Sequence, residues 1–533
     1  MHNETREEDV YMNTKKKKNL PIGISSFETL ISEDCLYIDK TELIYRLITT
    51  TKRYFLARPH RFGKSLLIST LKEIFSGNKE LFKNLWIGQE KHYKWKEHPV
   101  ITIDFSMIAH KNAGLLESGL AAELDIIGQN FGIKLFKTKG ITEKTKFLVR
   151  SLAEKRGRIV ILIDEYDYAL VNHINNPELA QQNRDILRSF YSCFKGLDEH
   201  LHFVFFTGVS KFSKTSVFSG LNNLKDISLT PAFATLCGYT EDEILQNFPA
   251  YIADFATVSN RSAEEIMNEM RTWYNGYRFS RAEAKVYNPF SVFHYLDEQH
   301  CGNYWFASGT PTFLVDLVKS NLPIFSEVDH CWVDDSTLDS FDIGTLPLTT
   351  LFYQTGYLTI EDFQPESNLY KLTYPNEEVR QSLNKYLISM MLNIKNAETA
   401  TVATRLKQVL QRGDIPQFCE TLQILLAHIP CQIHVQEEAY YHSLFHMICM
   451  MLGIDVASEV STSKGRVDLA LQTPAAIYLF ELKLGESPSK AITQIKERRY
   501  YEKYLSQKKP IYLIGMSFDY QDKKLAYIWE LLT

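Results

Sequence analysis

The sequence predicts an α/β protein with a doubly wound parallel sheet, a helical extension and a separate, smaller α/β domain. Two observations lead to this fold class. In the N-terminal half, short apolar runs alternate with longer helical patterns, as in a parallel sheet covered by helices. Near Cys431 the order changes to helix, strand, strand, helix, strand, which indicates another domain. At 533 residues, the chain is also too long for a single hydrophobic core.

Five apolar runs are predicted to be the strands of the first sheet, because each suits burial on both faces. The runs are Arg53–Ala57, Val100–Phe105, Ile159–Asp164, His202–Thr207 and Asp226–Leu229. Helical patterns separate these runs, so crossovers would join the strands into one domain that ends near residue 235.

The remaining boundaries follow changes in pattern. Residues 1–19 are polar and form a flexible tail, and residues 20–235 form the sheet domain. Residues 236–330 form a helical, lid-like region that opens with a capped helix start at Thr240. Residues 331–430 form a linking region of unknown role, and residues 431–533 form the C-terminal domain.

Composition narrows the setting but not the function. Hydrophobic residues make up 45% and charged residues 23%, as in ordinary globular proteins. The net charge of −5 does not exclude nucleic acid, because binding needs only a local basic face. The 8 cysteines include no C-x-x-C pair, which argues against a zinc knuckle or a disulfide framework and favours a cytoplasmic setting. No run of about 18 apolar residues occurs, so we expect no membrane-spanning helix.

A phosphate-binding loop is predicted at Arg58–Ser65, which follows an apolar strand and precedes a helical pattern. In such P-loops, backbone N–H groups and a helix N-terminus face phosphate oxygens. Gly63 permits a close approach, Lys64 would reach the terminal phosphates, and the Ser65 hydroxyl would coordinate magnesium. The sequence therefore predicts a P-loop NTPase fold with ATP and Mg²⁺ as cofactors.

Two arginines in this loop raise questions. The full P-loop pattern has glycine where this chain has Arg58, and a side chain there would reshape the first turn of the loop. Arg61 is a candidate phosphate contact, although an arginine pointing outward from the loop explains it equally well.

A pair of acids completes the predicted nucleotide site. The strand Ile159–Asp164 delivers Asp164 and Glu165 at its carboxyl end, where ligands bind in open α/β sheets. Asp164 would hold magnesium, directly or through water, and Glu165 would polarise the attacking water. A buried strand that ends in a solvated acidic turn is the alternative. Further along, Thr207 or Ser210 would sense the terminal phosphate, unless they form only a strand end and turn.

The C-terminal domain carries a second group of charges on a predicted hairpin. Asp468 lies on its first strand, and Glu481 and Lys483 share one face of the second. Two carboxylates this close repel each other unless a cation lies between them, so magnesium is the expected partner. The metal would acidify a water, and Lys483 would orient that water or stabilise charge. An ordinary cross-strand ion pair is the alternative.

Three further features surround this hairpin. Glu437 or Glu438 opens a predicted helix and would supply another metal ligand; Glu438 is the preferred candidate. Gln494 and Arg498, four residues apart on the next predicted helix, would face the same cleft. Basic residues and tyrosines are interleaved over 483–509, which suits a phosphate-backbone surface or a solvated helix.

These motifs together resemble a prokaryotic family that joins an AAA-ATPase-like N-terminal domain to a C-terminal domain of the PD-(D/E)xK nuclease superfamily. The N-terminal resemblance spans residues 20–235 and rests on Leu20–Gly23, Tyr37–Thr41, Arg58–Ser65 and Thr207–Leu224. An arginine-containing P-loop is typical of this family, which eases the concern over Arg58.

The C-terminal resemblance covers about residues 430–533 and implies a restriction-endonuclease-like fold. It implies that Asp468 and Glu481 are metal ligands, that Lys483 is catalytic and that Gln494 supports the site. The superfamily often has proline before the first aspartate, where this chain has Val467, a common departure.

Two functional hypotheses follow. In the first, an ATP-binding and ATP-hydrolysing protein is coupled to a metal-dependent nuclease domain, with nucleic acid, DNA placed first, as its partner. In the second, the chain is a non-cleaving, ATP-driven switch or scaffold whose nuclease-like domain only binds. ATPases of this class often assemble, and a neighbour's arginine then assists catalysis. A homo-oligomer is therefore a candidate assembly, with Arg271 and Arg278 as candidate arginines.

Overall fold

The structure is a computed structural model that describes residues 17–135, 140–211, 217–218, 224–308, 330–339, 348–428, 438–462, 465–519, 522 and 524–532. The chain divides into two compact units. Unit 1 comprises the described residues of Met1–Gly309 and Trp332–Asn376, and unit 2 those of Thr310–Cys331 and Glu377–Thr533.

Unit 1 contains the predicted parallel sheet, with strand order β2-β3-β4-β1-β5. The strands are β1 (Arg53–Ala57), β2 (Val100–Asp104), β3 (Ile159–Asp164), β4 (Leu201–Gly208) and β5 (Lys225–Asp226). The predicted α/β fold is thus confirmed, but the fifth strand is shorter than expected. Its chain turns away because the Asp226 carboxylate accepts a hydrogen bond from Ser228 N at 2.8 Å.

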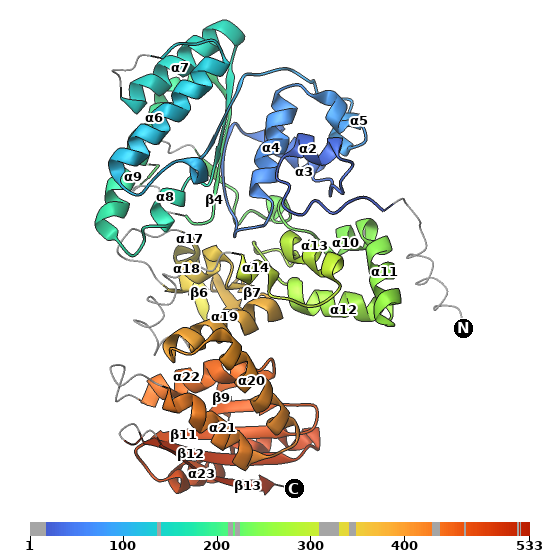
Figure 1. The fold of residues 1–533 in the computed structure, drawn as a ribbon, viewed down its shortest axis with the longest axis vertical. Coiled ribbons are helices and arrows are strands. Elements are labelled where there is room, and N and C mark those ends of the chain that lie inside the picture. The colour runs from blue at the N-terminus through green and yellow to red at the C-terminus, as the bar shows by residue number, and fades with distance from the viewer. Residues whose placement is uncertain are drawn as a thin grey trace. The chain divides into compact units, whose positions relative to one another are not determined.

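Helices cover both faces of this sheet (Figure 1). One layer contains α6 (Ala113–Asn130), α7 (Ile141–Arg156), α8 (Tyr168–Val171) and α9 (Pro177–Ser192); the other contains α2 (Phe27–Ser32), α3 (Thr41–Thr50), α4 (Lys64–Phe75) and α5 (Trp86–Gln89). Short 3-10 turns occur at η1 (Lys79–Phe82), η2 (Phe105–Met107), η3 (Cys193–His200) and η4 (Pro231–Phe233). Apolar side chains of β1 to β4 are buried beneath both layers, which explains the uninterrupted apolar runs in the sequence.

The rest of unit 1 contains a helical region and a small sheet. The helices are α10 (Glu241–Asn247), α11 (Pro249–Ser259), α12 (Ala263–Tyr274), α13 (Pro289–Glu298) and α14 (Tyr304–Ala307). A capping box between Thr240 and Glu243 starts α10, as predicted. The small sheet has the order β6-β8-β7, with β6 (Trp332–Asp334), β7 (Thr359–Gln364) and β8 (Leu369–Thr373), accompanied by α17 (Asp335–Asp339) and α18 (Leu348–Thr355).

Two of the segments defined by sequence fall differently in the structure. Of the tail assigned to residues 1–19, residues 1–16 lie outside the described residues; Lys18 pairs with Asp34 at 2.8 Å, and Asn19 forms a bridge with Cys35. The linking region 331–430 is divided, because residues 332–376 belong to unit 1 and residues 377–428 to unit 2.

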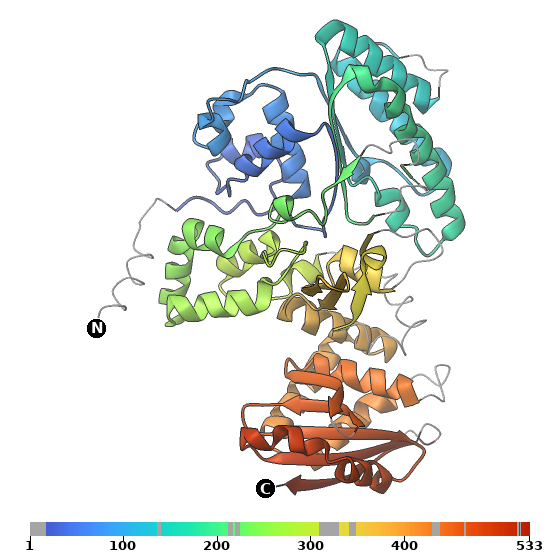
Figure 2. The ribbon, with the colours of Figure 1, turned by 180° about the vertical axis from the view of Figure 1, so that it is seen from behind.

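Unit 2 contains a five-stranded mixed sheet of order β13-β12-β11-β10-β9, with only the β11–β12 pair parallel. Figure 2 shows these strands side by side. They are β9 (Asp455–Thr462), β10 (Gly465–Gln472), β11 (Ile477–Leu484), β12 (Ile511–Asp519) and β13 (Lys524–Leu532). The helices are α19 (Glu377–Met391), α20 (Asn396–Gln411), α21 (Ile415–Ala427), α22 (Glu438–Met450) and α23 (Pro488–Glu497), with a 3-10 turn η6 (Tyr500–Gln507).

Helices pack on both faces of this sheet as well. Phe480 of β11 contacts Phe418 of α21 and Phe445 of α22 on one face. On the other face, α23 lies close over β12 because Gly515 has no side chain: a Cβ there would come within 2.5 Å of the Pro488 carbonyl oxygen. The mixed α/β architecture predicted for the C-terminal domain is confirmed.

Two expectations from composition concern the whole chain. The seven cysteines within the described residues are all free. No helix within the described ranges has both the length and the apolar character needed to cross a membrane.

Candidate active sites

The predicted P-loop lies between the end of β1 and the start of α4. Gly63 has a φ angle of 90°, in the left-handed region that glycine tolerates, and α4 begins at the next residue. Apart from Gly63 and its two chain neighbours, no atom of the described residues lies within 4 Å of the position that a Cβ on Gly63 would take. The first turn of α4 receives no hydrogen bond from a capping side chain. The loop therefore presents open space and uncapped backbone N–H groups, as an anion site requires.

The predicted lysine, serine and acids meet beside this loop. The Lys64 ammonium lies 3.3 Å from Glu165 Oε1 and donates to the Pro59 carbonyl at 3.2 Å. The Ser65 side chain lies close enough to the Asp164 carboxylate to act against the rise in its pKa. Residues about a hundred positions apart in sequence are thus gathered at the carboxyl ends of β1 and β3.

The two acids have opposite electrostatic character. Burial and the neighbouring Glu165 carboxylate raise the pKa of Asp164 to about 6. Burial also acts to raise the pKa of Glu165, but Lys64 and His60 outweigh it and hold that pKa below its usual value. Glu165 has a φ angle of 49°, a left-handed conformation that is uncommon for a non-glycine residue. The loop therefore holds Glu165 as an ionised partner of Lys64.

The sequence predicts that Arg58 reshapes the first turn of the loop, but its side chain contacts other parts of unit 1. Its buried guanidinium donates to the carbonyl of Ser228 at 2.8 Å and lies 4.2 Å from the ring centroid of Phe279. A weaker bond reaches the carbonyl of Phe233 at 3.4 Å. Burial lowers its pKa. Arg58 thus has a structural role next to the loop, because its side chain binds backbone carbonyls and an aromatic ring.

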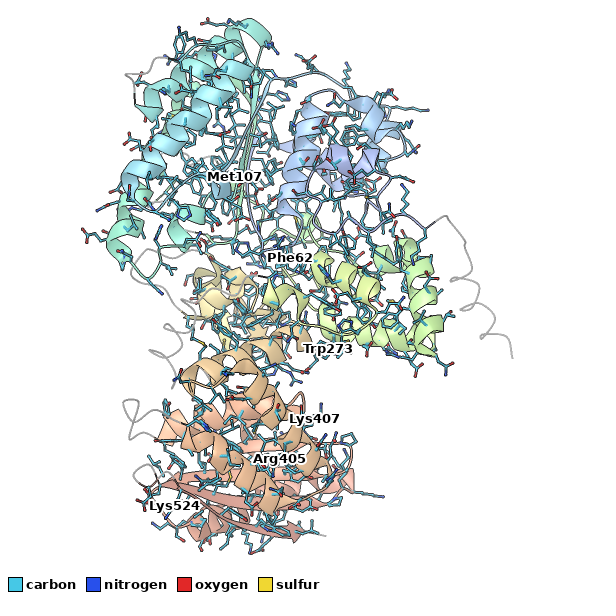
Figure 3. All side chains as sticks on the ribbon, viewed as in Figure 1. Phe62, Met107, Trp273, Arg405, Lys407 and Lys524 are labelled. Atoms are coloured by element: carbon cyan, nitrogen blue, oxygen red, sulfur yellow. The ribbon has the colours of Figure 1, made fainter. Side chains whose placement is uncertain are left out.

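Aromatic side chains of the helical region pack against the loop. Phe62, labelled in Figure 3, is buried with its ring 4.7 Å from Tyr277 and 5.4 Å from Phe279. The aromatic segment after Trp273 therefore packs on the P-loop itself. Arg61 is exposed, and its guanidinium lies 5.0 Å from the ring of Phe290. Its predicted phosphate contact stays a prediction.

The two candidate phosphate sensors at the end of β4 differ in their hydrogen bonds. Thr207 is 0% exposed, and its Oγ1 has no hydrogen-bond partner within the described residues. Thr207 stands opposite Leu56 of β1, and its carbonyl accepts from Tyr166 N, so it lies between the two loops of the site. Ser210, by contrast, gives its hydroxyl to the Asp167 carboxylate. Thr207 remains the candidate sensor, and Ser210 has a supporting role.

The second group of charges lies where β10 meets β11 in unit 2. Lys483 Nζ lies 3.2 Å from Glu481 Oε1, and Asp468 Oδ2 accepts from Leu482 N at 2.8 Å. The antiparallel register pairs Leu469 with Phe480, which brings the next residues, Asp468 and Glu481, to facing positions. The predicted juxtaposition of the two carboxylates is therefore present.

Burial dominates the electrostatics of this group. Burial, then Asp468, raises the pKa of Glu481 to about 7, although Lys483 acts in the opposite direction. Burial also raises the pKa of Asp468. The pKa of Lys483 is raised as well, because the neighbouring carboxylates outweigh the effect of its burial. Glu481 is 0% exposed, and its Oε2 has no hydrogen-bond partner within the described residues.

Helix α22 contributes two more side chains. Glu438 accepts from Lys483 Nζ at 3.5 Å and from Leu484 N at 3.3 Å, so it touches the group through the lysine. Its predicted role as a metal ligand stays a prediction, and Glu437 lies outside the described residues. One turn later, His442 Nε2 donates to the Asp468 carbonyl at 3.0 Å. The helix therefore holds both strands of the hairpin from one face.

Comparisons with known proteins agree with the predicted family of both domains. The family model described as "Predicted AAA-ATPase" matches residues 21–218, and the model described as "PD-(D/E)XK nuclease superfamily" matches residues 436–528. A protein of Azotobacter chroococcum mcd 1, named "Uncharacterized protein in vnfD 5'region", is 36% identical over 523 residues, which cover 96% of this chain and 98% of that protein. The chain belongs to the AAA-ATPase-like family with a C-terminal PD-(D/E)XK nuclease superfamily domain.

Two side chains of unit 1 bear on the predictions. Asp167, which sequence reasoning missed, accepts hydrogen bonds from Val209 N at 3.2 Å and Ser210 N at 2.7 Å. Its position three residues after Asp164 was visible in the sequence, but its partners were not. Arg278 is buried and donates to backbone carbonyls, including that of Glu361 at 3.0 Å.

Arg278 is therefore unavailable as an arginine that reaches into a neighbouring copy. Arg271 lies on the surface of α12 and pairs with Glu241 there. The residues 212–216 and 219–223 of the family-like segment Thr207–Leu224 lie outside the described residues.

The nuclease-superfamily domain leaves two predictions open. Gln494 is half-buried on α23, and within the described residues its side chain makes no hydrogen bond to the charged group. Across the described ranges, no group of three or more His, Cys, Asp or Glu side chains is arranged to hold a metal ion. Magnesium commonly takes one or two carboxylates and keeps several waters, so Asp468 and Glu481 suffice in number.

Proposed function

We propose that the AAA-ATPase-like domain binds and hydrolyses ATP with magnesium, and that the nuclease-superfamily domain cleaves nucleic acid phosphodiesters with a divalent metal. DNA is the first candidate substrate. One observation carries the proposal: each domain holds a lysine–glutamate pair in which one partner is buried, and also a buried side-chain oxygen that has no hydrogen-bond partner within the described residues. These pairs are Lys64–Glu165 and Lys483–Glu481.

The nucleotide site fits a triphosphate and its magnesium. The open space at Gly63 and the uncapped start of α4 suit phosphate oxygens. Lys64 would turn from Glu165 toward the phosphates, and Ser65 and Asp164 would hold magnesium, which shields the charge of the triphosphate. Glu165, kept ionised, would then orient and deprotonate the attacking water. The unpartnered hydroxyl of Thr207 would donate to the terminal phosphate.

The second site fits a divalent cation. A buried carboxylate oxygen without a partner is unfavourable, and a cation bound by Asp468 and Glu481 would remove that cost. Bound there, the metal would supply a more acidic water and neutralise charge on the phosphodiester. Lys483, held between Glu481 and Glu438, would orient the water or stabilise the developing charge. Gln494 stays a proposed supporting residue.

The test compares wild type with Lys64→Ala and Glu481→Gln. ATP hydrolysis and cleavage of single- and double-stranded DNA and RNA are measured with magnesium or manganese. Lys64→Ala should lower ATP turnover by about 10²–10³, and Glu481→Gln should remove cleavage while ATP turnover continues. Lys72→Ala on α4 and Glu486→Gln change exposed residues and serve as matched controls.

Each domain's proposed activity has its own contrary result. ATP turnover that survives Lys64→Ala would refute the nucleotide site. Binding of nucleic acid by wild type without cleavage under either metal would favour the second hypothesis, a non-cleaving, ATP-driven switch or scaffold. The lack of a three-ligand cluster within the described residues is the observation that keeps this second function in view.

A further inference from the structure

The backbone that follows β4 gives its N–H groups to side chains instead of to another strand. Val209 N and Ser210 N donate to Asp167, and Lys211 N donates to Gln354 Oε1 at 2.7 Å. All five residues are buried. Because a buried N–H without an acceptor is costly, these two side chains determine the path of the chain just beyond Thr207.

Asp167 ties this segment to the acidic loop. Asp167 lies two residues after Glu165, with Tyr166 between them. The Tyr166 hydroxyl donates to the Ser210 carbonyl at 2.9 Å, and Tyr166 N donates to the Thr207 carbonyl at 3.0 Å. The loop that carries Glu165 and the strand end that carries Thr207 are therefore cross-linked on both sides of Thr207.

Gln354 ties the same segment to α17 and α18. Its amide group accepts from Lys211 N and donates to the Asp339 carbonyl at 3.2 Å. The Lys211 ammonium lies 2.9 Å from Asp226, beside β5. Gln354 is only 5% exposed, so water does not readily replace these bonds. Residues 332–376 thus contribute an acceptor at the edge of the nucleotide site.

We propose that Asp167 and Gln354 are positioning residues for ATP turnover. Together they clamp the segment Val209–Lys211, so that the free hydroxyl of Thr207 stays aligned with the loop that carries Glu165. The inference rests on the proposed ATPase function and adds a role for residues 332–376, which support the site through Gln354. Small displacements of such groups lower the rate of the chemical step more than the binding of substrate.

The test uses Asp167→Asn and Gln354→Leu, with Thr350→Val as the matched control. Thr350 lies on the same helix as Gln354, is also buried and donates to the Thr337 carbonyl at 2.7 Å, but makes no hydrogen bond to Val209–Lys211 within the described residues. Each clamp variant should lower kcat for ATP by about tenfold to a hundredfold and leave the Kd of ATP unchanged. Thr350→Val should change neither quantity.

The double variant sharpens the test. Because Asp167 and Gln354 hold the same segment, the loss of kcat in Asp167→Asn/Gln354→Leu should be smaller than the product of the two single losses. Equal falls in kcat for Gln354→Leu and Thr350→Val would show a merely structural role and overturn the proposal. If Asp167→Asn does not fold, Gln354→Leu still decides.

Amide hydrogen exchange separates failure of the clamp from failure of the proposed function. The peptide that contains Val209–Lys211 should exchange faster in both clamp variants than in wild type or Thr350→Val, whether or not ATP is hydrolysed. Unchanged exchange overturns the clamp. A wild-type chain without ATP turnover but with the expected exchange pattern overturns the ATPase function and the catalytic value of the clamp, and leaves the contacts confirmed.

Discussion

The two candidate active sites use the same charges in different ways. In unit 1, Lys64 lies 3.3 Å from Glu165; in unit 2, Lys483 lies 3.2 Å from Glu481. The pKa of Glu165 is nevertheless below its usual value, whereas that of Glu481 is raised to about 7. The pKa values of the two glutamates are thus shifted in opposite directions although the two pairs are of nearly equal length.

The difference follows from the neighbours of each glutamate. Lys64 and His60 lower the pKa of Glu165. Burial and the adjacent Glu165 carboxylate instead raise the pKa of Asp164. Glu481 is buried beside Asp468 and shares its lysine with a second acid. We infer that Glu165 of the first site is already ionised, and that the second site requires an added cation before its glutamate ionises fully.

The largest effect is expected from a substitution of Glu165, which tests this comparison directly. Glu165→Gln removes the group that would accept a proton from water, so kcat for ATP should fall by about 10²–10⁴. ATP binding should persist or tighten, because Lys64 loses its partner and is free to meet the phosphates. Steady-state ATP turnover and calorimetric ATP titration provide the two measurements.

Glu178→Gln, at an exposed position on α9, is the matched control and should behave as wild type. A variant Glu165→Gln with normal kcat would show that Glu165 is only the resting partner of Lys64. The two sites would then share one role for their lysine–glutamate pairs, and the contrast drawn from the pKa values would fail.

The strands that carry the two sites could largely be predicted from local sequence. Buried strands in a parallel sheet are apolar on both faces, so Arg53–Ala57 and Ile159–Asp164 were predicted with their observed bounds. On β11, the two-residue period placed Glu481 and Lys483 together. The strand β5 was misjudged because its end is decided by a side-chain turn at Asp226, which no apolar pattern records.

Residues whose roles depend on distant partners could not be predicted in the same way. Arg58 was expected to disturb the P-loop, but its partners Ser228 and Phe279 lie about two hundred residues away. Asp167 finds its acceptor role only when β4 ends beside it. His442 lies one helical turn after Glu438, a spacing that the sequence shows, but the contact with the Asp468 carbonyl depends on how α22 crosses β10.

The next prediction sharpens the comparison at His442. Loss of the hydrogen bond to the Asp468 carbonyl should let this strand shift relative to Glu481, so His442→Leu should weaken manganese binding by about tenfold to a hundredfold. His442→Gln retains an N–H donor and should lose less affinity. Manganese affinity is measured by electron paramagnetic resonance of the full chain without nucleotide.

His428→Leu is the control, because His428 is exposed and its ring bonds the Ile424 carbonyl of its own helix, at 2.8 Å. Equal manganese affinity in wild type and His442→Leu would show that the strand holds Asp468 in place without the histidine. The electrostatic distinction of the second site would then rest on Glu481 and Asp468 alone.

The smallest expected effect concerns stability at the end of the parallel sheet opposite to Thr207. His202, near the start of β4, stacks on His98 with ring centroids 3.9 Å apart. Burial, then His98, lowers the pKa of His202 to about 4. A folded pKa below the unfolded one, about 6.5, means that stability is present above that pH and is lost as pH falls toward about 4.

His202→Phe keeps an aromatic ring in the stack but removes this titration. Relative to the variant, wild type should lose on the order of 1 kcal/mol of stability between about pH 6.5 and about pH 4, after allowance for partial exposure. This difference is measured by thermal unfolding, using the transition whose midpoint temperature ATP raises. ATP turnover at neutral pH should be unchanged, because the stack touches neither Thr207 nor the P-loop. If the stability of the two proteins changes in parallel with pH, this stack adds no pH-dependent stability. The pH dependence of unit 1 would then come from its acidic residues.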